Sequence, residues 1–120
     1  MKYSYYIFAA GVLIMIGCSS SDITSANDIV FPAKNVSFKG QVEPLFSIAC
    51  NSCHSPGNTV DLSSFVCVRA TRVINQPGDT NCGLIQVIYG RGAPHPGPIN
   101  IDNIRKQGLK QWVIEGAQDN

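Results

Sequence analysis

The sequence predicts a mainly α-helical fold in one small domain. Apolar side chains recur at helical spacing in three segments, at about 37–50, 81–89 and 100–117. Turn-forming residues separate these segments, and the chain has no internal repeat. About 85 of the 120 residues have the composition of a folded domain, which is enough for one domain but gives it a thin hydrophobic core.

The first helix is expected from about Ser37 to Cys50. Ser37 can cap its start, because a serine hydroxyl accepts a hydrogen bond from an unpaired N–H of the first turn. Pro44 lacks a backbone N–H, so the helix should form two pieces or begin effectively at Pro44. Its stripe of apolar side chains consists of Phe38, Val42, Leu45, Phe46 and Ala49.

Residues 61–72 allow two predictions. Asp61-Leu62-Ser63-Ser64-Phe65 resembles a capped turn that opens a short helix toward Arg72. Three β-branched residues make a strand the competing prediction; they are Val66, Val68 and Val73.

A turn at 76–79 precedes the next expected helix, from Asn81 to Tyr89, which Gly90 ends. Leu84, Ile85 and Ile88 lie on one face of that helix. Residues 91–98 read Arg-Gly-Ala-Pro-His-Pro-Gly-Pro, and three prolines remove N–H donors and hold their neighbours extended. This segment therefore predicts a stiff loop that displays His95.

The last helix is expected over Asn100 to Ala117, with Asn100 or Asp102 as its cap. Gly108 should weaken its middle. Its apolar stripe is predicted to consist of Ile101, Ile104, Leu109, Trp112 and Val113.

Residues 50–54, Cys-Asn-Ser-Cys-His, are typical of covalent haem attachment. Cys50 and Cys53 can add to the two vinyl groups of haem, and His54 can then ligate the iron from one face. A zinc half-site and a redox dithiol are the alternatives, and both are more typical of a reducing compartment. We therefore expect one covalently bound haem c, with its iron, as the cofactor.

Residues 1–17 predict the signal peptide of an exported lipoprotein. Lys2 precedes a mostly apolar run at 5–16 that is too short to span a membrane. Met15-Ile16-Gly17-Cys18 resembles a bacterial lipobox, with methionine in place of the usual leucine, so cleavage would leave Cys18 as a lipidated N-terminus. An ordinary signal with an incidental cysteine is the alternative. We expect residues 18–35 to form a flexible tether and the lipid to anchor the chain in the bacterial envelope, at the periplasmic face or outer membrane.

The remaining cysteines, Cys67 and Cys82, make an even pair that can form one disulfide in an oxidising compartment. Their separation would give about 3 kcal/mol on the chain-entropy model. Two free thiols are the alternative. The charge is close to balanced, with nine basic and eight acidic residues, and no basic patch suggests nucleic acid as a partner.

Four segments together resemble the small class I type cytochromes c of exported planctomycete and Bacteroidetes proteins. The first is VSFKGQVEPLFSIACNSCH, at 36–54. It is followed by VDLSSF at 60–65, VINQPGDTNCGLIQVIYG at 73–90 and WVIEGAQDN at 112–120. The resemblance implies a monohaem domain over 36–120, with the first and last helices crossing, Phe46 near Trp112, and the haem wrapped between these helices and the loop that follows.

The second axial ligand departs from that family. Its members usually carry Met-Pro before the last helix, but this chain has Ala93-Pro94 there, with His95 next. Met1 and Met15 are the only methionines, and both precede Cys18. We therefore expect His54 and His95 to ligate the iron together, with a lowered reduction potential. The alternative is His95 on the surface, with the iron five-coordinate, water-bound or held by Lys110.

These ligation states separate the possible functions. An iron with two protein ligands suits a carrier that moves single electrons between redox partner proteins, either free or as a subunit of a larger chain. An open sixth position would instead suit a sensor of small ligands or a weak peroxidase. We do not expect an independent enzyme, because the acidic residues are scattered singly along the chain; they include Glu43, Asp61, Asp79, Asp102 and Glu115.

Overall fold

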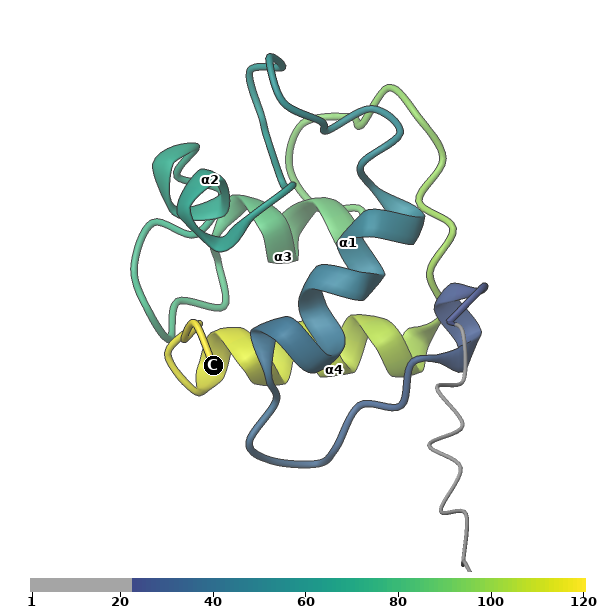
Figure 1. Ribbon diagram of the computed structural model, residues 1–120. Helices are drawn as coiled ribbons and strands as arrows, with labels where there is room; N and C mark the ends of the chain where they lie inside the picture. The colour runs from purple at the N-terminus through teal and green to yellow at the C-terminus, as the bar shows by residue number, and fades with distance from the viewer. Residues whose placement is uncertain (1–22) are drawn as a thin grey trace, which may run out of the picture.

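The computed structural model describes residues 23–120, and within that range it is helical without β-strands (Figure 1). The elements are η1 (Ala26–Asp28), η2 (Phe38–Val42), α1 (Glu43–Ala49), α2 (Phe65–Ala70), α3 (Gly83–Ile88) and α4 (Asn103–Ile114). The prediction of a mainly α domain is confirmed. The expected signal peptide and the lipidated Cys18 lie outside the described residues.

The first helical segment forms in two pieces, as Pro44 predicts. The Ser37 hydroxyl accepts a hydrogen bond from the Gly40 N–H at 3.0 Å and caps η2, which has the wider turn of a π-helix. Pro44 lies in the first turn of α1, where the missing N–H has no intrahelical partner to lose. Together η2 and α1 end at Ala49, directly before Cys50.

A helix, not a strand, follows Ser64. The Ser64 hydroxyl accepts from the Cys67 N–H at 3.3 Å and caps α2. Asp61 closes the turn before this helix, because its carboxylate accepts from the Ser63 N–H at 2.8 Å. Further along, α3 ends where Gly90 adopts a positive φ of 65°, as its sequence position predicts.

The last helix, α4, is shorter than expected and buries most of the predicted apolar stripe. Asp102 caps it by accepting from the Arg105 N–H at 2.9 Å. The predicted apolar stripe is wrong at Ile104, which is 61% exposed. Gly108 is buried because the Phe31 ring lies against it, and a Cβ on this glycine would come within 2.2 Å of that ring. The N-terminal segment therefore covers α4 at Gly108, beside the core residues Leu109 and Trp112.

The main core lies between the first helical segment and α4, which cross in Figure 1. The Phe38 ring is 5.6 Å from that of Trp112 and 5.3 Å from that of Phe65, measured between centroids. Phe38 therefore provides the aromatic contact to Trp112, while the expected partner, Phe46, is buried in the same core. Asn120 closes this end of the molecule by accepting hydrogen bonds from the backbone of Phe38 and Lys39.

The segment that precedes the first helical elements packs against the domain. Ile29 is buried at 2% exposure, and the Arg105 guanidinium donates to the carbonyls of Ala26 and Asn27. The prediction of a flexible tether over 18–35 is therefore wrong for residues 25–35. The physical reason is that these short polar residues find hydrogen-bond partners on α4, far away in the sequence.

Candidate functional site

A cavity of about 570 Å³ lies between the end of α1, the loop after it, residues 95–100 and η1. Its volume falls in the range of roughly 300–1,000 Å³ that is common for cofactor sites. Cys50, Cys53, His54 and His95 all line it. The structure therefore brings the four residues that the sequence predicts for haem binding to one cavity.

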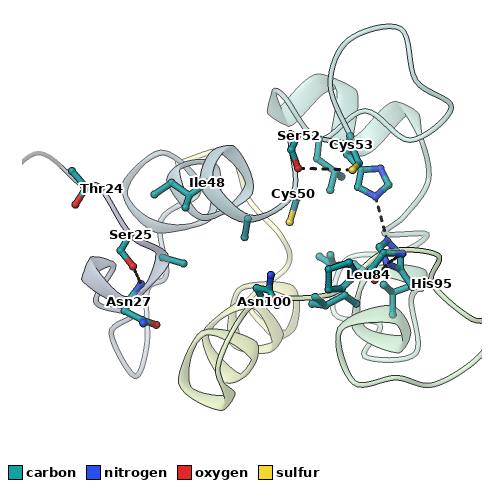
Figure 2. Close-up of a pocket in the computed structure, with 18 residues that line it drawn as sticks. Thr24, Ser25, Asn27, Ile48, Cys50, Ser52, Cys53, Leu84, His95 and Asn100 are labelled. Carbon is teal, nitrogen blue, oxygen red and sulfur yellow. Dashed lines mark hydrogen bonds between the residues drawn. The ribbon is translucent and has the colours of Figure 1, made fainter.

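A tight turn after α1 places the Cys-Asn-Ser-Cys-His residues on the cavity. The helix ends at Cys50, whose carbonyl accepts from the N–H groups of Cys53 at 3.1 Å and His54 at 3.0 Å. The Cys50 sulfur points into the cavity in Figure 2, and Cys53 is exposed beside it. The spacing of the motif thus places both thiols and the imidazole on the same cavity.

The two histidines face one another across the cavity. His54 Nε2 lies 3.5 Å from His95 Nε2, and the ring centroids are 5.8 Å apart (Figure 2). His95 stands in the proline-rich loop between α3 and α4, where none of the residues 91–98 is helical. The expectation of a loop that displays His95 is confirmed, and its imidazole is half-buried, turned toward His54.

Backbone carbonyls orient both imidazoles. His54 Nδ1 lies 3.0 Å from the Val60 carbonyl, so this nitrogen carries a hydrogen. His95 Nδ1 lies 2.8 Å from the Gly97 carbonyl and 3.3 Å from the Gly97 N–H. The shorter contact favours a hydrogen on Nδ1 here too. In that state both Nε2 atoms present lone pairs to each other, and a cation between them would satisfy both.

The donor set fits the iron of a haem. Two metal–imidazole bonds of about 2.0–2.1 Å in line place the nitrogens about 4 Å apart. The observed 3.5 Å is within a small side-chain movement of that value. Within residues 23–120 no group of three or more His, Cys, Asp or Glu side chains could hold a metal ion.

Burial sets the protonation of the inner thiol. It raises the pKa of Cys50 to about 11, so this thiol is protonated at neutral pH. A protonated thiol is a poor attacking group in thiol exchange. The pKa of Cys50 therefore weighs against the redox-dithiol alternative for the pair.

The cavity also has a polar wall that the sequence reasoning missed. Residues 24–27 and Asn100 form it, at the end away from the histidines (Figure 2). The sequence predicts residues 24–27 as part of the tether because of their composition, and Asn100 as a possible cap of the last helix. One signal could have found them, since Ser25 and Asp28 have the spacing of a capping box, and the Ser25 N–H does donate to the Asp28 carboxylate at 2.9 Å.

Three other predicted residues lie away from this arrangement. Cys67 and Cys82 are free thiols in the structure, so their predicted disulfide is not formed in it. Cys82 is buried, and burial raises the pKa of its thiol. Lys110, the alternative iron ligand, is not among the residues that line the cavity.

No described helix is long and apolar enough to cross a membrane. The sequence matches no family model, and no curated protein or solved structure matches it either. The resemblance to class I cytochromes c thus stays a prediction.

Proposed function

We propose that this protein is a membrane-tethered, monohaem c-type cytochrome that carries single electrons between redox partner proteins. The observation that carries the proposal is the pair of imidazoles whose Nε2 atoms face each other at 3.5 Å in a cavity lined by Cys50 and Cys53. In this assignment both thiols form thioethers to haem c, and His54 and His95 are the axial ligands.

The haem iron, when bound, supplies a centre that changes its charge by one electron. The chain's own residues keep its coordination constant. His54 and His95 would both hold the iron, which would leave dioxygen, carbon monoxide and peroxide no open position. The hydrogen bonds to the Val60 and Gly97 carbonyls make both imidazoles stronger donors, and stronger donors favour the oxidised iron. These features support a carrier of lowered reduction potential over a sensor or peroxidase.

The proposed setting is the surface of a membrane in the bacterial envelope. A lipidated Cys18 would hold the domain there beside its redox partners. The near-neutral charge of the chain gives little long-range electrostatic steering, so partners held on the same membrane suit it best.

Covalent attachment is tested with protein made in a host that can mature c-type cytochromes. The wild type should show a Soret band, and its pigment should stay with the polypeptide in acidified acetone. The double variant Cys50→Ala/Cys53→Ala should lose the pigment. Cys67→Ala, which changes a cysteine outside the cavity, is the matched control and should keep it. Wild-type protein without a Soret band would reject the proposal.

Axial ligation is tested by the His95→Ala variant. The wild type should be low-spin and resistant to carbon monoxide, whereas the variant should become high-spin and bind it. Arg91→Ala is the control, because Arg91 is an exposed residue of the same loop. Rapid binding of carbon monoxide by the wild type would show that His95 is not a ligand and would favour the sensor or peroxidase.

A further inference from the structure

The side of the molecule where the described chain begins carries several exposed apolar residues, and we call it the N-terminal face. Val30 is 78% exposed, Ile104 is 61% exposed and Ile23 is 42% exposed. The face consists of Ile23, Val30, Phe31, Pro32, Ala33 and Ile104.

Four of these residues pack together against α4. Phe31, Pro32, Ala33 and Ile104 line a single hollow of about 230 Å³. The bonds from Arg105 to two carbonyls of η1 keep the start of the segment at the beginning of α4. Figure 1 shows the segment running from η1 along the lower side of α4, on the side where the described chain starts. The face is thus built by packing and is not a flexible end.

The charge of the face is small. Asp28 and Lys34 are exposed beside it and have opposite signs. Gln107 and Gln111 complete the hollow with uncharged polar groups. A partner bound here would therefore be held by apolar contact and not by charge.

The length of chain to Cys18 limits how far this face can lie from a lipid anchor. Ile23 lies five residues after Cys18, and at about 3.3–3.6 Å per residue this stretch spans at most about 18 Å. A small domain is about 30 Å across. A lipid on Cys18 would therefore keep the N-terminal face near the bilayer, where a short linker gives a high effective concentration.

We propose that the N-terminal face docks on the phospholipid bilayer that holds the lipidated Cys18, with Val30 and Ile104 entering the boundary between headgroups and acyl chains. The inference rests on the lipid anchor of the proposed function. Docking would fix the orientation of the domain. The polar wall of the cavity at 24–27 would lie near the membrane, and α2, on the other side of Figure 1, would face solution.

Hydrogen exchange on vesicles tests the docking. The full lipidated protein is bound to phosphatidylcholine vesicles containing one-fifth phosphatidylglycerol (about 20%), and its exchange is compared with that of soluble Cys18→Ala protein. Backbone amides at 29–34 should exchange about fivefold more slowly on vesicles, as expected for a face docked about four-fifths of the time. Amides of α2 should be unchanged.

A matched pair of variants separates docking from tethering. Val30→Asp should abolish the protection at 29–34 while the protein stays on the vesicles through its lipid. Val66→Asp on α2 changes a residue of similar exposure, 73%, and should leave the protection intact. Equal loss of protection in both variants would overturn the proposal, and so would loss of protection in high salt.

The outcomes distinguish the two proposals. Intact-mass measurement shows whether Cys18 carries acyl chains. An acylated, vesicle-bound protein without protection at 29–34 would reject the docking and leave the electron carrier standing. An unacylated protein would reject the docking together with the anchor, while the Soret band and the carbon monoxide test still decide the haem.

Discussion

At the residue scale, the candidate site could largely be predicted from the sequence, and its fine geometry could not. Cys50, Cys53 and His54 are fixed by local spacing, because a turn of five residues brings them together whatever the rest of the chain does. His95 could be predicted as a partner because it is the other histidine and because it follows Ala93-Pro94, where the resembled family carries Met-Pro. The carbonyls that orient both rings belong to irregular loops, whose conformations no periodic pattern encodes.

The identity of the residue at position 95 should set the reduction potential. In the His95→Met variant a thioether would replace an imidazole, and the thioether favours reduced iron more. We expect the potential to rise relative to wild type in a potentiometric titration followed at the Soret band. Arg91→Ala should leave the potential unchanged. A lower reduction potential in the methionine variant, or an unchanged one, would contradict ligation by His95.

Gly108 should be needed for close packing, although glycine has a low helix propensity. Alanine would gain about 1 kcal/mol in an exposed helix. Here its Cβ would come within 2.2 Å of the Phe31 ring, and such overpacking typically costs about 1–3 kcal/mol. We expect Gly108→Ala to lower the urea midpoint, whereas Gln107→Ala on the exposed side should not. A more stable Gly108→Ala protein would show that Phe31 does not pack as described.

At the scale of elements, the helices could be predicted and the N-terminal segment could not. Caps and apolar spacing are local signals, and they locate η2, α1, α3 and α4 to within a few residues. The segment before them is held by partners nearly 80 residues away, since Arg105 binds the carbonyls of η1 and Glu115 binds the N–H groups of Asn35 and Val36. A polar composition does not distinguish a flexible tether from a segment that is held on the domain by distant residues. The sequence therefore predicted a tether.

The Glu115 contact predicts a pH dependence of stability. The Gln111 amide and the Val36 and Asn35 N–H groups donate to its carboxylate and hold its pKa below the ordinary value. A lowered pKa stabilises the fold above the unfolded pKa, about 4.3, and this contribution is lost as the pH falls through the folded value. We expect Glu115→Gln to lower Tm at pH 7, with the difference from wild type closing as the pH is lowered past 4.

A half-buried carboxylate without such hydrogen bonds provides the control for that measurement. Glu43 lies in the first turn of α1, and none of the hydrogen bonds described for residues 23–120 holds its side chain. Glu43→Gln should give a Tm difference from wild type that changes little over the same pH range. A constant difference for Glu115→Gln as well would contradict the assigned role.

At the scale of the whole molecule, a small domain surrounds a large cavity. Residues 23–120 bury a core of eighteen side chains, mostly between the first helical segment and α4, while the cavity of about 570 Å³ separates α1 from the loop that carries His95. Interiors of folded proteins are otherwise packed without such voids. The cavity therefore marks the part of the domain whose stability depends most on what fills it.

Haem should accordingly be required for full stability. We expect the holoprotein to unfold cooperatively at a higher temperature than the Cys50→Ala/Cys53→Ala protein prepared without haem, because a group bound only by the folded state stabilises it. Thermal unfolding followed by circular dichroism should show this difference in the Tm of the whole chain. Equal Tm values with and without haem would show that the cavity does not hold it.

The prolines on either side of His95 have a consequence for the speed of electron exchange. Pro94 and Pro96 have fixed φ angles, and each also restricts the residue before it, so the backbone that presents the imidazole has few alternative shapes. In the proposed haem site, an imidazole held in this way would keep nearly the same position when the iron changes its charge. Little nuclear rearrangement would then accompany each transfer, so a rigid loop of this kind would favour rapid electron exchange between the proposed donor and acceptor.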